Sequence, residues 1–161
     1  MIWLIGLVMV LLLAVSVIRG APYVPTHQKQ IEIALDLLDL KPGEHLVDVG
    51  AGDGKVLLAG ARRGLKVTGY EINPLLWMIS WIRLGRYRSS SQIIWGDIWR
   101  KKLPSDCRAI FVFTMARYLP KLEEKILADG LGGVRLASHG FELPDRKPIE
   151  TKQAIHLYKI D

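Results

Sequence analysis

Three acidic residues stand at the ends of predicted strands, where side chains can act on a ligand. Asp48 belongs to the run Val47-Asp48-Val49-Gly50-Ala51-Gly52-Asp53-Gly54. Glu71 comes 19 residues after Gly52, and Asp97 lies in the later run Gly96-Asp97-Ile98. The carboxyl ends of parallel strands meet at one edge of a sheet, and open α/β folds bind their ligands there. We therefore expect the three carboxylates to line one site.

The glycine turn after Asp48 offers a bare backbone to a ligand, because glycine has no Cβ to hold the ligand away. Its spacing is not the dinucleotide fingerprint Gly-x-Gly-x-x-Gly, since Gly54 comes one residue too early. A carboxylate as close as Asp48 would also repel a pyrophosphate, whereas it attracts a cation. S-adenosylmethionine, which carries a sulfonium and an ammonium group, is a ligand of this kind.

The other two acids suit the remaining parts of that ligand. A carboxylate at Glu71 can accept hydrogen bonds from both ribose hydroxyls. Asp97 can accept from the adenine amino group, and Ile98 can pack on the ring. Each feature alone is also found as a plain turn, a helix-capping glutamate or a surface aspartate. Together and in this order they predict an S-adenosylmethionine site.

The elements that must position these residues alternate between helix and strand. A first helix, capped by Thr26, shows the apolar spacing Ile31, Ala34, Leu35, Leu38 and ends at Lys41-Pro42-Gly43. Further helices are predicted over about 55–63, 74–84 and 119–128, and strands over 45–49, 66–70, 92–95, 109–113, 134–138 and 154–160. Strands separated by helices predict an α/β fold, with a mostly parallel sheet and helices on both faces.

The composition shows that an apolar N-terminal segment precedes this domain. Residues 1–18 hold no charge, so all 22 basic and 16 acidic residues fall in the rest of the 161-residue chain, whose net charge is +6. That balance points to an anionic partner or a membrane surface. A single cysteine, Cys107, excludes an intramolecular disulfide, and the Cys and His residues show no metal-ligand spacing. No metal is expected.

The apolar start is either a membrane anchor or a cleaved signal peptide, with a buried helix as a third possibility. A signal peptide carries positive charge before its apolar core, whereas Arg19 is the first basic residue here. We favour a transmembrane anchor over residues 1–19, a linker over 20–25 and a catalytic domain over 26–161. Arg19 after the apolar run then places that domain on the cytoplasmic side, or on the equivalent inner side of an organelle membrane.

Five runs connect the chain with a known family: Pro22-Tyr23-Val24-Pro25-Thr26, Val47–Gly54, Gly69-Tyr70-Glu71-Ile72-Asn73-Pro74, Gly96-Asp97-Ile98-Trp99 and Phe141-Glu142-Leu143-Pro144. Over about residues 21–148 the chain resembles class I (seven-strand-type) S-adenosylmethionine-dependent methyltransferases. More narrowly, it is similar to the small membrane-anchored protein-lysine methyltransferases that act on the ATP synthase c-subunit and on the adenine nucleotide translocase. One departure is Gly140, where relatives often carry a basic residue before the aromatic at position 141.

The resemblance implies a Rossmann-like methyltransferase fold and a set of cofactor-binding residues. Thr26 would reach the methionine end of the cofactor, unless its hydroxyl caps the helix. The full set is Thr26, Asp48, Gly50, Ala51, Gly52, Glu71, Ile72, Asp97 and Ile98. His139 and Tyr118 lie near strand ends and can orient an amine or serve the structure alone, and no catalytic residue is assigned.

The expected substrate is a lysine of a membrane-associated protein. Methyltransferases of nucleic-acid bases usually carry Asn/Asp-Pro-Pro-aromatic after the fourth strand, whereas this chain reads Phe113-Thr114-Met115-Ala116-Arg117, so no nucleic acid is expected. Two alternatives stay open: methylation of a small-molecule or lipid amine, and a non-catalytic S-adenosylmethionine-binding membrane protein.

The run Leu75–Leu84 (LLWMISWIRL) is apolar nearly all round and is followed by Arg86 and Arg88. It is either a helix packed on the sheet before solvated basic loops, or a basic face that rests on the bilayer.

Overall fold

The computed structural model describes Trp3 and residues 24–161. The predicted anchor over residues 1–19 and most of the linker lie outside the described residues. The helices are α2 (Gln28–Leu38), α3 (Lys55–Arg62), α4 (Pro74–Arg83) and α5 (Leu119–Ala128). The strands are β1 (His45–Val49), β2 (Lys66–Glu71), β3 (Ser91–Trp95), β4 (Cys107–Val112), β5 (Val134–His139), β6 (Glu150–Lys152) and β7 (Ile155–Ile160). None of the described helices is both long and apolar enough to cross a bilayer.

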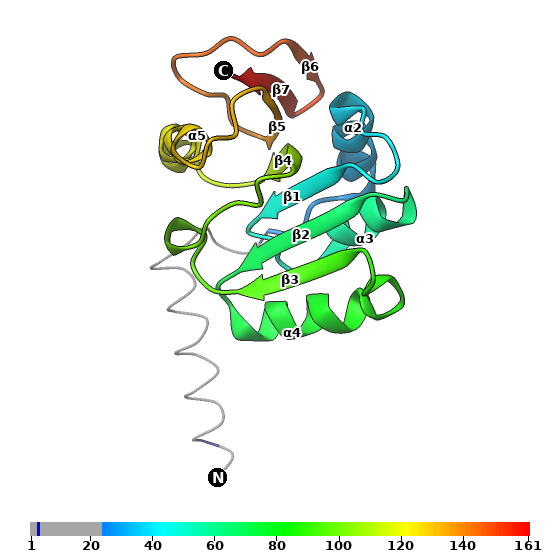
Figure 1. Ribbon diagram of the computed structural model, residues 1–161. Coiled ribbons are helices and arrows are strands. Elements are labelled where there is room, and N and C mark those ends of the chain that lie inside the picture. The colour runs from blue at the N-terminus through cyan, green and yellow to red at the C-terminus, as the bar shows by residue number, and fades with distance from the viewer. Residues whose placement is uncertain (1–2, 4–23) are drawn as a thin grey trace.

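The strands form one seven-stranded sheet in the order β3-β2-β1-β4-β5-β7-β6 (Figure 1). β1 pairs in parallel with both β2 and β4, and β4 pairs in parallel with β5. β7 runs antiparallel between β5 and β6. Every residue of β1 is buried, as expected of a central parallel strand that is covered on both faces. The strand order reverses between β1 and β4, which places a crevice at their carboxyl ends.

Two apolar cores lie on opposite faces of the sheet. One contains the buried faces of α2 and α3 together with Leu84, which follows α4. The other contains Leu119, Leu122 and Ile126 of α5 together with Ile98 and Leu103. In Figure 1, α5 accordingly lies on the other side of the strands from α2, while α4 runs along the edge strand β3. The predicted α/β fold with helices on both faces is confirmed.

Two local features differ from those predicted from the sequence. The first helix is capped at His27, which makes no side-chain capping bond, and not at Thr26. Thr26 precedes the N-cap residue by one position, so its hydroxyl is not placed to accept a hydrogen bond from the amides of the first turn. The other difference is β6, a three-residue strand with every residue exposed, which therefore lacks an apolar pattern.

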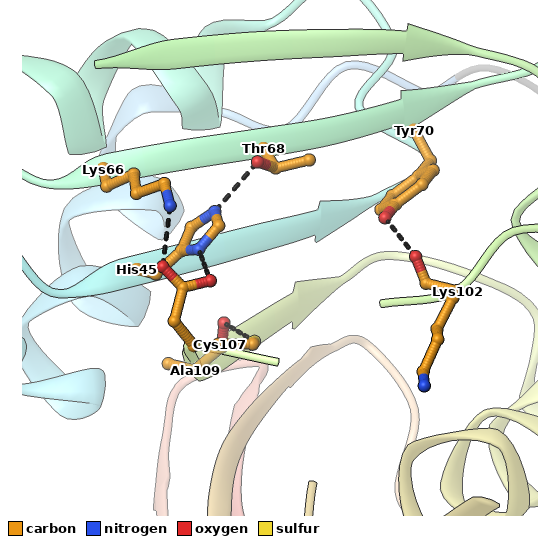
Figure 2. Close-up of polar contacts among 8 residues, drawn as sticks. His45, Lys66, Thr68, Tyr70, Lys102, Cys107 and Ala109 are labelled. Carbon is orange, nitrogen blue, oxygen red and sulfur yellow. Dashed lines mark hydrogen bonds and ion pairs between the residues drawn. The ribbon is translucent and has the colours of Figure 1, made fainter. Parts of the chain in front are cut away.

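A polar cluster of two buried and two exposed residues lies at the amino edge of the sheet (Figure 2). The His45 imidazole lies 2.8 Å from both an Asp106 carboxylate oxygen and the Thr68 hydroxyl, and the Lys66 ammonium lies 2.6 Å from the other Asp106 oxygen. Burial lowers the pKa of His45. Cys107, which starts β4, donates to the Ala109 carbonyl at 3.3 Å, and burial raises its pKa to about 12. These groups at the amino edge therefore satisfy one another's hydrogen bonds.

Candidate functional site

A cavity of about 270 Å³ opens at the carboxyl edge of the sheet, where the strand order reverses. Its walls come from the segments that follow β1, β2, β3 and β4, together with Val24-Pro25-Thr26 before α2. All nine predicted cofactor-binding residues line this one cavity: Thr26, Asp48, Gly50, Ala51, Gly52, Glu71, Ile72, Asp97 and Ile98. The structure thus brings the three carboxylates together at one edge as expected, and the role of each of the nine residues toward a ligand stays a prediction.

The glycine turn is anchored to β2 by its backbone. The amides of Gly50 and Ala51 both donate to the Tyr70 carbonyl, at 3.0 and 2.9 Å. Gly50 has φ +82°, and a Cβ built there meets no protein atom within 4 Å. Gly54 caps α3 at φ +78°, and its Cβ would lie 2.3 Å from the Ser80 hydroxyl. Glycine at these positions therefore sets the turn, brings α3 against α4 and leaves space beside the cavity.

Asp48 lies beneath the turn with 2% of its surface exposed. Burial, with the neighbouring charges of Glu71 and Asp53, raises its pKa to about 8. The carboxyl group is therefore mostly protonated at neutral pH, and a cation bound beside it would favour the ionised form. This arrangement matches the predicted preference for a positively charged ligand.

Glu71 holds the turn and the start of α4 together. One carboxylate oxygen accepts from the Gly52 amide at 2.7 Å, and the other accepts from the Asn73 amide at 2.8 Å. Burial raises its pKa, while these backbone bonds oppose the rise. Each oxygen keeps a second lone pair, so the carboxylate can also accept from ligand hydroxyls.

The third strand ends in a mixed polar and apolar wall. Asp97 accepts from the Trp99 amide at 3.0 Å and so caps the short turn Ile98–Arg100. Ile98 is buried, and it lines the cavity together with Ile72 from the segment after β2. Two branched apolar side chains from neighbouring strand ends suit the faces of a planar ring.

Aromatic side chains complete the site, and apart from Tyr118 they were not predicted to belong to it. Trp99 and Tyr118 lie with ring centroids 6.2 Å apart, and Phe111 and Phe113 come from β4 and its carboxyl end. The signal that could have found Trp99 is its place directly after Asp97-Ile98. Of the two residues considered for orienting an amine, Tyr118 lines the cavity. His139 does not line it and instead packs against Phe113, with ring centroids 4.1 Å apart.

The donor set fits S-adenosylmethionine. Asp48 offers a carboxyl group whose ionised form a bound cation favours, Glu71 offers carboxylate oxygens near the bare turn, and Ile72 and Ile98 offer apolar walls. Within the described part of the chain, no three His, Cys, Asp or Glu side chains form a group that could hold a metal ion.

Comparison with known proteins agrees with this geometry. A family model described as "ANTKMT methyltransferase domain" matches residues 48–150. The adenine nucleotide translocase lysine N-methyltransferase of Mus musculus is 37% identical over 133 residues, which are 80% of this chain and 56% of that protein. The lysine N-methyltransferase of Mus musculus that is named for the ATP synthase C-subunit is 30% identical over 81% of this chain and 53% of its own length. The chain therefore spans about half the length of these two relatives.

In two further matches the alignment covers most of both proteins. A protein-lysine N-methyltransferase of Saccharolobus islandicus is 24% identical over 84% of this chain and 86% of its own length. An RNA methyltransferase from Salinibacter ruber, solved with S-adenosyl-L-homocysteine, superimposes with a TM-score of 0.75 at 23% identity and covers 85% of this chain and 94% of its own. At that identity the structural match supports the fold alone.

Proposed function

Because the chain belongs to the family of the ANTKMT methyltransferase domain, we propose that it methylates a lysine side chain of a membrane-associated protein. S-adenosylmethionine is the cofactor, and it supplies an electrophilic methyl group. The observation that carries the proposal is the single cavity in which the glycine turn, the three acids and an aromatic wall meet. Curated relatives named as lysine N-methyltransferases support the choice of substrate.

The residues of this cavity provide orientation and desolvation. A lysine ammonium group must lose a proton before its nitrogen can attack a methyl group, and an apolar environment favours the neutral amine. Trp99, Phe113 and Tyr118 form such an environment beside the acidic turn. Holding the amine in line at close range accounts for a large part of a transfer rate, so no strong base is required.

We also propose that residues 1–18 anchor the chain in a membrane and that the domain lies on the cytoplasmic side or its organellar equivalent. The segment carries no charge, and Arg19 follows it at once. An anchored domain meets lysines near the bilayer at high effective concentration. The expected substrate is therefore a protein whose lysine lies close to the membrane.

A methyl donor labelled in its transferred methyl group tests the proposed activity. Full-length protein incubated with this donor and with membranes should place the label in a protein band that is sensitive to protease. Label that extracts with lipid or a small molecule would favour the amine-methyltransferase alternative. If cofactor binds and no label is transferred, the chain is a non-catalytic binding protein.

The anchor has an independent test. Full-length protein should remain in the membrane pellet after a carbonate wash, and a reporter fused after Asp161 should behave as cytoplasmic. A shortened protein released on the other side would instead establish a signal peptide and overturn the anchor.

A further inference from the structure

Helix α4 presents an apolar face to solvent. Met78, Trp81 and Ile82 share the i, i+3, i+4 spacing of one helix face, and their exposed fractions are 45%, 44% and 63%. Trp95, at the end of the neighbouring edge strand β3, is also exposed, at 59%. Large side chains gathered on one face mark an interaction site more often than exposed apolar residues scattered singly.

The other face of α4 already has its partners. Ser80 is fully buried against the cap of α3, and the Trp77 indole N–H donates to the Ile93 carbonyl at 3.1 Å. Trp77 also contacts Trp95, with ring centroids 6.3 Å apart. The exposed residues are thus a second, outward face that packing on the sheet does not require.

Positive charge borders this face. The Arg88 guanidinium lies over the Trp81 ring, 3.7 Å from its centroid, and Arg86 is exposed two residues earlier. Within residues 24–161 neither arginine takes part in an ion pair, whereas Arg83 is bound to Asp53. Aromatic side chains at headgroup depth with arginines beside them are the pattern of a surface that binds anionic lipid.

The first turn of α4 lies at the same cavity as the first described residues of the domain. Leu75 and Leu76, in the first turn of α4, line the same cavity as Val24 and Pro25. A chain anchored through residues 1–18 therefore enters the domain beside the start of α4.

We propose that the outward face of α4, with Trp95, Arg86 and Arg88, docks on the anionic lipid surface of the membrane and so fixes how the domain lies on the bilayer. This docking rests on the proposed anchoring. Lipid is favoured over a second copy, because pairing two such faces about a twofold axis would bring their arginines together. An anionic bilayer instead complements the charge and accepts the apolar residues at its interface.

A depth-sensitive probe tests the docking in the full-length chain. Ile82→Cys and, as matched control, Leu127→Cys each receive a bimane label; Leu127 is 44% exposed on α5 across the sheet. Cys107 is buried and stays unlabelled. Both proteins are reconstituted in vesicles of phosphatidylcholine with phosphatidylglycerol that contain brominated lipid. Bromine should quench the label at position 82 and leave the label at position 127 bright.

Charge reversal supplies the second measurement. Arg86→Glu with Arg88→Glu should reduce quenching at position 82, by about fivefold in the docked-to-free ratio for each positive charge removed. Affinity for S-adenosylmethionine should not change in this variant, which shows that the domain is folded. Equal quenching at positions 82 and 127, or quenching that ignores both phosphatidylglycerol and the charge reversal, would overturn the docking.

Two further outcomes separate the possibilities. If position 82 is shielded from brominated lipid and from aqueous iodide alike, another protein surface covers the face and the lipid proposal fails. Flotation of the vesicles reports anchoring independently, so protein that floats without quenching at position 82 refutes the docking alone. Quenching as expected with no methyl transfer would refute the proposed activity and support the docking.

Discussion

Asp48 should couple cofactor binding to the release of a proton. Its pKa of about 8 in the ligand-free site falls when a cation binds beside it, so binding selects the ionised form. At pH 7 a group with this pKa is about 90% protonated, and ionising it costs about 1.4 kcal/mol. Affinity for S-adenosylmethionine should therefore be about tenfold weaker at pH 7 than at pH 9 through this group alone.

The Asp48→Asn variant isolates this contribution, because the amide has no proton to release. Isothermal titration calorimetry on both proteins between pH 6 and pH 9 gives the ratio of their affinities, in which titration of the ligand itself cancels. The wild-type advantage should grow about tenfold from pH 7 to pH 9. A ratio that stays constant over this range would refute the assignment of Asp48 to the cationic part of the ligand.

The same residue predicts the pH dependence of stability without ligand. The pKa of Asp48 is raised from 3.8 to about 8 in the fold, so between these values the folded state holds more protons than the unfolded state. The free energy of unfolding through this group therefore decreases as pH rises across that window. Asp48→Asn should gain thermal stability relative to wild type between pH 5 and pH 8, while its affinity for cofactor falls. A parallel loss of both would indicate damage to the fold.

Three other substitutions have defined outcomes. Glu71→Gln should weaken S-adenosylmethionine binding by about 1–3 kcal/mol in calorimetry, because the carboxylate loses its charge toward the ligand and toward the Gly52 and Asn73 amides; unchanged affinity would remove the ribose assignment. Gly69→Ala places a Cβ 2.5 Å from Leu57 Cδ1 and 2.8 Å from Ala51 Cβ, so chemical denaturation should show a loss of about 1–3 kcal/mol, and wild-type stability would contradict the packing described. Burial lowers the pKa of His45, so below pH 6.5 the unfolded state binds more protons than the folded state, and the free energy of unfolding decreases as the pH is lowered. This decrease should be smaller in His45→Gln, and identical pH profiles of the two proteins would refute the burial argument.

The sequence was sufficient for the parts of the fold that repeat a simple pattern. The buried run of β1 and the glycine turn after it predicted a ligand at a strand end, and Asp48 and Glu71 line that cavity. It was insufficient where a residue acts through distant partners. Phe113 enters the site because β4 lies next to β1, a pairing that has no local signature. Trp99 could have been found from its place directly after Asp97-Ile98, where Asp97 caps a short turn.

Thr26 illustrates the same limit at short range. A threonine before an amphipathic helix is typical of a cap, yet His27 takes that position and Thr26 lines the cavity. Propensity alone could not distinguish the two, because a shift of one residue decides whether a hydroxyl can cap the helix. Only the folded structure shows that Thr26 lies at the cavity wall.

The wall formed by Val24, Pro25 and Thr26 has a practical consequence for the design of truncated proteins. A shortened version that starts at α2 would lack one side of the cavity and would misrepresent the affinity of the full-length chain. Hydrogen exchange offers a direct view of the same feature. Ligand should slow exchange at the amide of Thr26 together with that of Gly52, although the two residues are 26 positions apart in the chain.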